Sequence, residues 1–598
     1  MKSGIGQEDG RKSSLKAWVR ALEMTAPIAQ NPARTLPVLI DSLAERFGNA
    51  PALLSRSESL NYRALADRSN RYTQWALRRG LSFGDVVCLL MPNCPEYVAI
   101  WLGITRVGAI VSLLNTNLVG DSLAHAINIV TPKHIIVSAT LADAFDSVVT
   151  KTSPEIQRWV HGENSHEFLR IDDELEQSDT VDIAGTEYRA ATIADRALYI
   201  YTSGTTGLPK AVNVSHFRLM QWSHWFAGMM DTRPDDRVYN CLPMYHSVGG
   251  VAAIGAALVN GASVVLRERF SASRFWDDIV ESKCTIFQYI GELCRYLVNN
   301  PTHPGEWQHQ LRLACGNGLG ADVWEEFQRR FNIPQILEFY AATEGSFSLY
   351  NTEGRIGSIG RIPSFLRHRL SIALVKFDHE LGEPIRNEDG FCVRCSHNEA
   401  GEAIGLIDGT SGAGRFEGYA DQSATEKKIL RDVFAKGDAW FRTGDLMSTD
   451  ASGFFYFVDR VGDTFRWKGE NVSTTEVAAS VCASPDAIEA VVYGVTVPGA
   501  EGRAGMVAAV VRPTFDLVAF HQHLGERLPA YARPVFLRIL GKLETTATFK
   551  LKKQDLIRES YNPKVTADPI YFNDPIRQSF VKVDSALFER IQSGKMRL

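Results

Sequence analysis

The spacing of apolar residues in the first third of the chain predicts strands and helices in alternation. Residues 84–93 and 134–139 are short apolar runs bounded by turn or polar residues, which is typical of buried strands. Residues 94–108 and 118–130 instead place apolar side chains three or four residues apart, which is typical of helices. The order strand, helix, strand predicts parallel sheets whose faces are covered by helices.

The same alternation returns in residues 236–345 and then stops. Residues 350–460 are richer in glycine and turn signals, which predicts short strands. After residue 463 a compact segment again combines strands and helices. The sequence therefore predicts a large α/β domain and a smaller C-terminal domain, with a junction near residue 460.

The composition is that of a globular protein and excludes several classes of function. The chain has 598 residues, of which 45% are hydrophobic and 22% are charged, and its net charge is −5. This charge gives no overall attraction to nucleic acid, so no nucleic-acid partner is expected. Nine dispersed cysteines favour a reducing compartment. Cys392 and Cys395 form one C-x-x-C without a second pair, so we expect packing cysteines rather than zinc ligands.

Neither a secretory signal nor a membrane span is predicted. The N-terminus is polar and has no apolar signal core. Residues 97–115 are the best candidate for a span, but Arg106 interrupts them and Gly108 divides them into a helix and a strand. We therefore expect a soluble, cytoplasmic protein, whose composition also permits peripheral contact with the inner face of the cell membrane.

The segment YTSGTTGLPK, residues 201–210, combines the groups that bind polyphosphate. Its glycines let the backbone approach a ligand, its hydroxyl and N–H groups donate hydrogen bonds, and Lys210 adds a positive charge. It is not a P-loop, because the spacing differs and Ala211 stands where that motif has Ser or Thr. A flexible surface turn is the alternative interpretation. The flanking residues predict a strand on each side, the second of which leads into a helix.

EFYAATEG, residues 338–345, is a weaker signal with two interpretations. Tyr340 could stack on a base, Thr343 could bind a phosphate, and Glu344 could hold Mg²⁺. The alternative is the start of a helix that Thr343 caps.

Three further segments are also ambiguous when each is taken alone. In WFRTGDL, residues 440–446, Asp445 could accept two ribose hydroxyls or form an Asx turn. DRVGDTFRWKGENVSTTEV, residues 459–477, combines basic residues with glycines. TATFKLKK, residues 546–553, places Lys550 beside two more lysines, which is also typical of a solvated strand edge.

Taken together and in this order, these segments resemble the acyl-adenylate-forming superfamily, which comprises acyl-CoA synthetases, peptide-synthetase adenylation domains and luciferases. The resemblance covers roughly residues 40 to 560. The segments YIYTSGTTGLPK, EFYAATEGSFSLYN, RTGDL and DRVGDTFRWKGENVSTTEV are most similar to the branch of fatty-acid transport proteins and very-long-chain acyl-CoA synthetases. The resemblance implies a large N-terminal domain of layered, mostly parallel sheets with helices and a small β-barrel-like part, residues 1–461. It also implies a smaller, mobile α+β C-terminal domain, residues 462–598.

The roles known in the family transfer to the matching positions of this chain. The resemblance implies a phosphate-binding loop, an adenine slot and a ribose contact in the large domain, and one lysine in the small domain. The implied ATP-binding residues are Thr202, Ser203, Gly204, Thr205, Thr206, Gly207, Lys210, Gly316, Asn317, Gly318, Phe339, Tyr340, Thr343, Asp445, Arg460 and Lys550. The implied catalytic residues are Lys550, Thr343, Glu344 (also the Mg²⁺ ligand) and His246.

Some of these positions carry a qualification. His246 matches the place where the family has an aromatic residue or His beside the acyl carboxylate, and a core histidine is the alternative. Gly462 matches the hinge, where many relatives carry Asp or Lys, so bending is permitted but a hinge charge is absent. Gly469 falls in the segment that would line the coenzyme A channel. The common YGxTE motif has glycine where this chain has Ala341.

The implied function is a long- or very-long-chain fatty acid–CoA ligase, which forms acyl-AMP and then the thioester and releases pyrophosphate and AMP. The implied cofactors and cosubstrates are ATP, Mg²⁺ and coenzyme A. Residues 242–261 contain no carboxylate that could pair an amino-acid ammonium, and their small side chains would leave room for a long acyl chain. Trp222 and Trp225 could gate that chain, contact a membrane, or belong to the core.

Two other functions remain open at this point. One is a fatty acyl-AMP ligase that passes the acyl group to a carrier protein. The other is a fatty-acid uptake or binding protein with a vestigial nucleotide site. A homodimer is compatible with the sequence.

Overall fold

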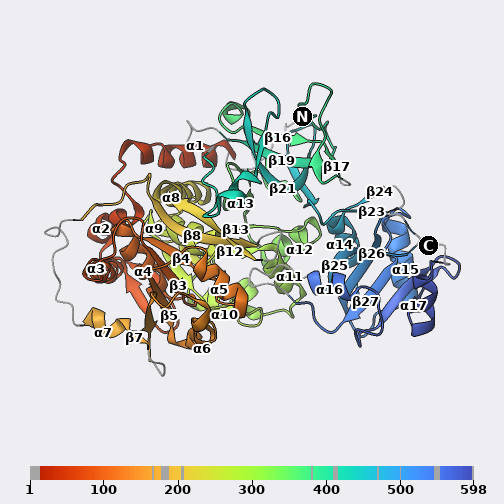
Figure 1. The fold of residues 1–598 in the computed structure, drawn as a ribbon, viewed down its shortest axis with the longest axis horizontal. Coiled ribbons are helices and arrows are strands. Elements are labelled where there is room, and N and C mark those ends of the chain that lie inside the picture. The colour runs from red at the N-terminus through yellow and green to blue at the C-terminus, as the bar shows by residue number, and fades with distance from the viewer. Residues whose placement is uncertain are drawn as a thin grey trace, which may run out of the picture.

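The fold is described from a computed structural model, in which a smaller C-terminal domain lies beside a large one (Figure 1). The described residues are 14–163, 168–176, 188–203, 208–378, 381–407, 415–467, 470–498, 500, 502–544 and 553–594.

Two mostly parallel sheets form the large domain. The eight-stranded sheet has the order β15 (Ser348–Asn351), β14 (Ile336–Ala341), β13 (Leu313–Asn317), β12 (Ile286–Ile290), β10 (Arg237–Asn240), β11 (Ser263–Leu266), β1 (Pro51–Leu54) and β2 (Ser59–Asn61). The seven-stranded sheet has the order β7 (Leu169–Arg170), β6 (Gln157–His161), β5 (His134–Ser138), β3 (Val86–Leu90), β4 (Ile110–Leu113), β8 (Arg196–Ser203) and β9 (Pro209–Ser215). The pairs β14–β15, β1–β2 and β8–β9 are antiparallel, and the others are parallel.

Helices lie between and outside these sheets (Figure 1). They are α1 (Ser14–Thr25), α2 (Leu36–Phe47), α3 (Tyr62–Arg78), α4 (Pro95–Arg106), α5 (Gly120–Asn128), α6 (Ala142–Asp146), α7 (Ile171–Glu176), α8 (His216–Met230), α9 (Ala253–Leu258), α10 (Phe275–Glu281), α11 (Gly291–Asn299) and α12 (Ala321–Phe331). A π-helical turn, Val248–Ala252, precedes α9, and 3₁₀ turns lie at Ile28–Gln30, Ala139–Leu141, Val149–Lys151, Pro304–Trp307 and Ser364–Leu366.

The most apolar run of the sequence is a buried helix and strand, as predicted. Residues 97–115 comprise most of α4, a turn at Gly108 with φ +82°, and β4. A Cβ atom on Gly103 would lie 2.2 Å from the Ser69 carbonyl oxygen, so glycine lets α4 pack closely on α3. Among the described residues no helix is long and apolar enough to cross a membrane.

A smaller antiparallel sheet follows in the chain, where the barrel-like part was predicted. Its order is β16 (Ile372–Val375), β19 (Gly401–Leu406), β21 (Ala439–Thr449) and β20 (Ile429–Arg431), and β22 (Phe455–Arg460) also pairs with β21. The ribbon β17 (Phe377–Asp378) with β18 (Glu383–Pro384) and the short helix α13 (Gln422–Glu426) lie in the same part of the chain.

The C-terminal domain has a sheet and a core of its own. The sheet order is β25 (Ala487–Val495), β26 (Ala504–Val511), β27 (Phe536–Leu540), β28 (Ile570–Asp574) and β29 (Ser579–Lys582). The ribbon β23 (Phe465–Trp467) with β24 (Glu470–Val472) and the helices α14 (Thr474–Cys482), α15 (Leu517–Arg527), α16 (Gln554–Glu559) and α17 (Ser585–Gln592) complete it. Its buried cluster runs from Phe465 to Ile591 and is separate from the cores of the large domain. The boundary between residues 461 and 462 stays a prediction.

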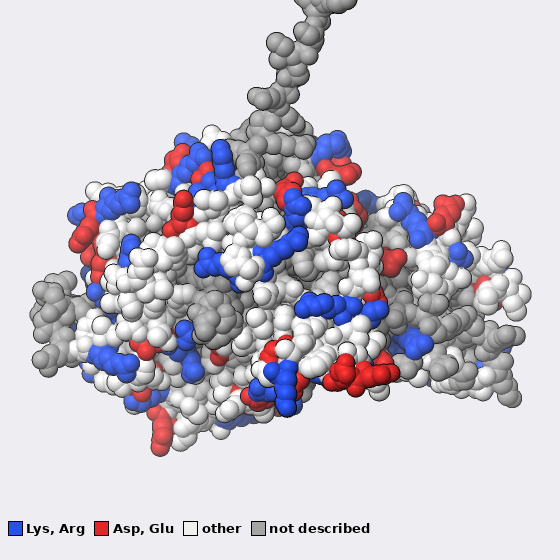
Figure 2. Space-filling model, turned by 90° about the horizontal axis from the view of Figure 1, so that it is seen from above, with Lys and Arg blue, Asp and Glu red and all other residues white. Residues whose placement is uncertain are grey.

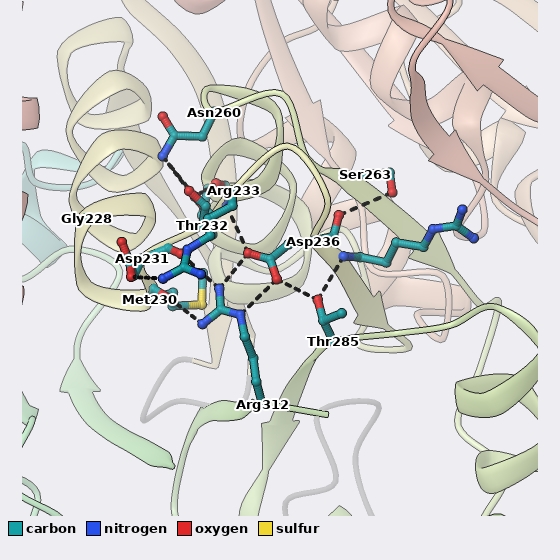
Figure 3. A network of polar contacts seen from close by, with 12 residues as sticks. Gly228, Met230, Asp231, Thr232, Arg233, Asp236, Asn260, Ser263, Thr285 and Arg312 are labelled. Atoms are coloured by element: carbon teal, nitrogen blue, oxygen red, sulfur yellow. Dashed lines mark hydrogen bonds and ion pairs between the residues drawn. The ribbon is translucent and has the colours of Figure 1, made fainter. Parts of the chain in front are cut away.

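A polar network locks the amino ends of the parallel strands in the eight-stranded sheet (Figure 3). Asp236, just before β10, accepts hydrogen bonds from Arg312 at 2.5 and 2.8 Å and from the Thr285 hydroxyl at 2.7 Å. Arg312 also donates to the carbonyls of Met230 and Asp231 at the end of α8. At the opposite, carboxyl ends of these strands lie residues predicted to bind the nucleotide, which is the usual place for a ligand in α/β sheets.

Helix α1 was not predicted, and it packs on α8. Trp18 is 1% exposed, and its ring meets those of Trp225 and Tyr350 edge-on. The Arg20 guanidinium donates to the Gly228 carbonyl at 2.6 Å. Trp225 is partly buried and packs against the core, which is close to one of its predicted alternatives.

Candidate active site

The predicted phosphate loop connects the antiparallel strands β8 and β9. Thr202 and Lys210 are cross-strand partners on either side of it. Both flanking strands and the helix that follows were predicted, and the strand–turn–strand path differs from the strand-to-helix turn of a P-loop. Gly204, Thr205, Thr206, Gly207 and the side chain of Ser203 lie outside the described residues.

The predicted adenine slot lies at the carboxyl ends of β13 and β14. Gly316 and Asn317 end β13, and Gly318 has φ +81°, a left-handed conformation that favours glycine. A Cβ atom on Gly316 would lie 2.2 Å from the Tyr289 carbonyl oxygen, so the strands pack closely here. The Phe339 side chain is 2% exposed and packs in the core, so only its backbone can face a nucleotide.

Glu338 holds this slot together, and the sequence did not predict it. Its carboxyl group accepts hydrogen bonds from the N–H groups of Gly318 at 2.5 Å and Leu319 at 3.2 Å, and from the Tyr289 hydroxyl at 2.5 Å. Burial raises the pKa of Glu338 to about 8. The first residue of EFYAATEG thus orders the turn after β13.

Tyr340 and Asp445, 105 residues apart, meet at the predicted ribose contact. The Tyr340 hydroxyl donates to Asp445 Oδ2 at 2.6 Å. Asp445 lies 3.4 Å from the Arg460 guanidinium, its partner across β21 and β22. The ring of Tyr340 lies against that of Phe347, with 5.8 Å between their centroids. Asp445 lies within β21, and its carboxylate contacts Tyr340 and Arg460 rather than forming an Asx turn, while its role as a ribose contact stays a prediction.

The Thr343–Glu344 turn lies between β14 and β15. The alternative that Thr343 caps a helix is wrong, because the chain turns at residues 342–345 and continues into β15. The Thr343 hydroxyl is 3.2 Å from the Ser247 hydroxyl. Glu344 is 8% exposed, and its Oε1 accepts a hydrogen bond from Tyr419 at 2.6 Å.

His246 lies directly before Ser247 and is half-buried rather than a core residue. Its ring is tilted against that of Tyr245, with 4.6 Å between the centroids, and its carbonyl accepts a hydrogen bond from Gly250 at 2.7 Å. The segment that carries His246 therefore reaches the Thr343 turn through Ser247.

The glycines after His246 serve close packing, which corrects the argument that they leave room for an acyl chain. A Cβ atom on Gly250 would lie 1.8 Å from the Met244 carbonyl oxygen. A Cβ atom on Gly255 would lie 1.9 Å from the Ser223 hydroxyl on α8. These positions are glycine because backbone and helix already occupy the space beside them.

The predicted hinge lies between a contact that joins the two domains and an ion pair within the C-terminal domain. Gly462 has φ +91°, and nothing lies within 4 Å of the place where its Cβ atom would be. Before it, Asp459 accepts hydrogen bonds from the N–H and hydroxyl of Thr474 at 2.7 and 3.1 Å. After it, Asp463 pairs with Lys553 at 3.0 Å. Two predicted residues, Lys550 and Gly469, lie outside the described residues.

Comparisons with known proteins place this chain in a family. The family described as AMP-binding enzyme matches residues 40–388, and the family described as AMP-binding enzyme C-terminal domain matches residues 476–550. The chain is 40% identical to long-chain fatty acid transport protein 1 of Mus musculus over 94% of this chain and 88% of that one. It is 41% identical to long-chain fatty acid transport protein 6 of Mus musculus over 91% of this chain and 88% of that one.

Solved structures agree with the fold. The structure of an anthranilate CoA ligase in complex with anthranoyl-AMP is similar at a TM-score of 0.74 and 22% identity, over 87% of this chain and 96% of that one. The Mycobacterium tuberculosis fatty acyl CoA synthetase is similar at a TM-score of 0.61 and 22% identity, over 88% of this chain and 98% of that one. The predicted fold class is thereby confirmed. The family matches confirm the predicted enzyme class, an AMP-forming acid–thiol ligase that uses ATP. The chain belongs to the AMP-binding enzyme family and, within it, to the branch of the long-chain fatty acid transport proteins.

Proposed function

We propose that this enzyme joins long- or very-long-chain fatty acids to coenzyme A in two steps, through acyl-AMP. The observation that carries the proposal is the turn with Thr343 and Glu344, which follows β14 and meets Ser247, the residue after His246, at 3.2 Å. The relatives that carry long-chain fatty acids in their names support the substrate class.

Glu344 fits the Mg²⁺ ion that this reaction implies. Its carboxylate is a hard oxygen ligand, is 8% exposed, and accepts one hydrogen bond from Tyr419. A buried carboxylate is stabilised by a cation. Mg²⁺ is commonly held by one or two protein carboxylates together with substrate phosphates, so one glutamate suffices. When bound, the ion offsets negative charge on the phosphates of ATP.

The other predicted residues would hold ATP around this turn. The loop from Thr202 to Lys210 would grip the β- and γ-phosphates, and Thr343 the α-phosphate. Asp445 would accept the ribose hydroxyls beside Arg460, with Tyr340 as the donor that fixes its carboxylate.

In the first step a fatty carboxylate oxygen attacks the α-phosphorus, and pyrophosphate leaves. The carboxylate is already ionised at neutral pH, so no base is needed. The difficulty is repulsion between two anions, which Lys550 and the loop donors would reduce. His246 would lie beside the acyl carboxylate.

In the second step the thiol of coenzyme A attacks the acyl carbonyl carbon, and AMP leaves. The C-terminal domain would rotate about Gly462, which withdraws Lys550 and brings the Gly469 segment to the coenzyme A channel. Exclusion of water would protect acyl-AMP from hydrolysis.

We further propose that the enzyme works at the inner face of the cell membrane. On the face seen in Figure 2, Lys and Arg side chains lie in short, separate groups, so no single wide basic patch covers it. Helix α1 exposes Leu15 and Val19, one turn apart, at 49% and 44%. Apolar side chains on an amphipathic helix can enter a bilayer interface. Reduced sedimentation with lipid vesicles after changing both to Gln would support this contact, and unchanged sedimentation would exclude it.

Light scattering would decide whether the protein is a homodimer.

Product analysis tests the main proposal. Purified protein is incubated with ATP, Mg²⁺, coenzyme A and fatty acids from short to very long, and products are read by mass spectrometry. We expect acyl-CoA and AMP with long chains. Acyl-AMP that accumulates despite coenzyme A would indicate a ligase that serves a carrier protein. The absence of ATP consumption would indicate a binding or transport protein.

A further inference from the structure

Residues 415–420 form a bridge between the phosphate loop and the Glu344 turn. The N–H of Asn213 donates to the Gly418 carbonyl at 3.0 Å, and the N–H of Ala420 donates to the Ala211 carbonyl at 2.8 Å. The segment therefore runs along β9 like a short additional strand. β9 is the strand that leaves the phosphate loop, so the bridge is fixed to one side of the site.

Tyr419, at the centre of the bridge, reaches the other side. Its side chain is 5% exposed, and its hydroxyl donates to Glu344 Oε1 at 2.6 Å. The Lys210 ammonium lies 5.8 Å from the centre of its ring. A phenol with the ordinary pKa of about 10 carries its proton at neutral pH, so this hydroxyl is the donor to the carboxylate.

Arg218 on α8 holds the backbone of the turn on both sides of Glu344. Its guanidinium is 5% exposed and donates to the carbonyls of Thr343 at 2.6 Å, Gly345 at 3.3 Å and Arg415 at 2.6 Å. One planar group thus joins both residues that flank Glu344 to the start of the bridge. The backbone on either side of the carboxylate is held, so the remaining freedom is that of the Glu344 side chain itself.

Glu417 anchors the bridge to the start of α8. Its carboxylate accepts hydrogen bonds from the Ser215 N–H at 2.7 Å and hydroxyl at 2.5 Å. Because the bridge is attached at β9 and at α8, the Tyr419 hydroxyl is held in place independently of Glu344.

We propose that Tyr419 is a positioning residue for adenylation, which fixes Glu344 Oε1 and so directs Oε2 to the magnesium–ATP complex. The inference rests on the proposed function, in which Glu344 holds Mg²⁺. The hydroxyl limits the rotation of the carboxylate and occupies one of its oxygens. Through the bridge, Glu344 also keeps a fixed distance from the strand that carries Lys210. Partners of this kind around a metal ligand typically change metal affinity or activity by roughly 10- to 100-fold when removed.

The variant Tyr419→Phe tests this, because it removes only the hydroxyl. Adenylation is measured as pyrophosphate release from a long-chain fatty acid and ATP, across a range of Mg²⁺ concentrations. We expect the Mg²⁺ concentration for half-maximal rate to rise roughly 10-fold or more. We expect the KM for the fatty acid and thioester formation from supplied acyl-AMP to stay unchanged.

The matched control is Tyr72→Phe. Tyr72 is 0% exposed, and its hydroxyl donates to Glu96 Oε1 at 2.5 Å between α3 and α4, so the control also removes a buried Tyr–Glu hydrogen bond. Both variants should lose similar thermal stability, but only Tyr419→Phe should change the Mg²⁺ dependence. An equal response of the two variants would overturn the inference.

Glu344→Gln and the double variant separate the inference from the proposed function. If Glu344→Gln impairs adenylation and Tyr419→Phe adds little to it, Tyr419 acts through Glu344. If Glu344→Gln impairs adenylation but Tyr419→Phe alone does not, the role of Tyr419 is wrong and the proposed function survives. If Glu344→Gln leaves adenylation and its Mg²⁺ dependence unchanged, the metal role of Glu344 and the inference both fail.

Discussion

The nucleotide side of the site and the C-terminal domain are held in different ways. On the nucleotide side, buried hydrogen bonds connect segments that are far apart in sequence, such as Tyr340 to Asp445 and Arg218 to Thr343. Beside the hinge, Asp459 of the large domain accepts a hydrogen bond from Thr474 of the C-terminal domain. A second contact brings Tyr296 of α11 to Glu489 of β25.

We expect this difference to let the two steps of the proposed reaction, adenylation and thioester formation, be impaired separately. Among the described residues, Tyr340, Asp445, Thr343 and Glu344, which are expected to bind ATP and its metal ion, are held by contacts within the large domain. Under the proposed function, the contribution of the C-terminal domain would depend on its orientation, which Gly462 would allow to change. Substitutions on the nucleotide side should therefore affect adenylation, and substitutions at the hinge should affect how the two steps are coupled.

Lys550→Ala should have the largest effect and would test this separation directly. Loss of a charge that offsets the developing negative charge should slow adenylation by roughly 10²- to 10³-fold. Thioester formation from supplied acyl-AMP should be unchanged, because Lys550 would be withdrawn in that step. Pyrophosphate release and acyl-CoA formation measure the two steps separately. Lys552→Ala is the control, and an equal loss in both steps would contradict the domain rotation.

Gly462→Pro should uncouple the two steps. Proline holds φ at roughly −65° and therefore excludes the φ of +91° that Gly462 has. We expect the complete reaction to fall roughly 10-fold or more, since a conformational step limits many enzymes of this kind. At least one half-reaction, measured alone, should fall much less.

Gly437→Pro is the matched control for the hinge. Gly437 has φ +87°, and nothing lies within 4 Å of the place of its Cβ atom. Its N–H also donates to Asp432, so proline should destabilise there at least as much. If both variants lower the complete reaction and the half-reactions in the same proportion, Gly462 has no special role in coupling.

Asp445→Asn should weaken ATP binding, by a smaller factor than the loss of adenylation that is expected for Lys550→Ala. The change weakens the contact with Arg460 and the hydrogen bond from Tyr340, and charged hydrogen bonds contribute about 1.5–3 kcal/mol. We expect the KM for ATP to rise roughly 10-fold, which corresponds to about 1.4 kcal/mol, with the KM for the fatty acid unchanged. Asp450→Asn is the control, because Asp450 accepts a hydrogen bond from Tyr456 in the same sheet at 3.1 Å. A rise in KM for both substrates would indicate a general disturbance.

The sequence predicted features that depend on local pattern. Strands β3, β5, β8 and β9 and helices α4 and α5 follow from the spacing of their apolar residues. The grouping of Thr343, Glu344 and Asp445 in one site came from the family resemblance of their short motifs, and their roles toward phosphate, metal and ribose stay predictions.

What could not be predicted depends on tertiary contact. Tyr419 and Arg218 lie 75 and 125 residues from the residues they contact in the turn, and no spacing rule connects them. The glycines after His246 suggested open space, but whether a small residue leaves room or permits close packing is decided by its neighbours, here Met244 and Ser223. Glu338 stood within a predicted motif, yet its three donors become visible only when β13 and β14 are paired.

Glu338→Gln should have the smallest effect on activity and would show whether the adenine slot is held without a charge. Burial raises the pKa of Glu338 from 4.5 to about 8, so between these values the folded protein keeps a proton that the unfolded chain has released. The stability that Glu338 contributes is therefore complete below about pH 4.5 and is lost as pH rises through about 8, at up to about 1.4 kcal/mol for each pH unit. Glutamine can accept the same N–H hydrogen bonds from Gly318 and Leu319 but cannot ionise.

Thermal unfolding at about pH 6 and about pH 9 measures this. From the lower to the higher pH, the wild-type protein should lose more stability than the Glu338→Gln variant does. The two proteins should have similar rates of adenylation near neutral pH. Glu402→Gln is the control, since Glu402 is 1% exposed and pairs with Arg442, and its loss should lower stability at both pH values. Parallel changes in wild type and Glu338→Gln would mean that Glu338 is ionised in the folded protein. In that case three hydrogen bonds outweigh burial, and the slot is ordered around a charge.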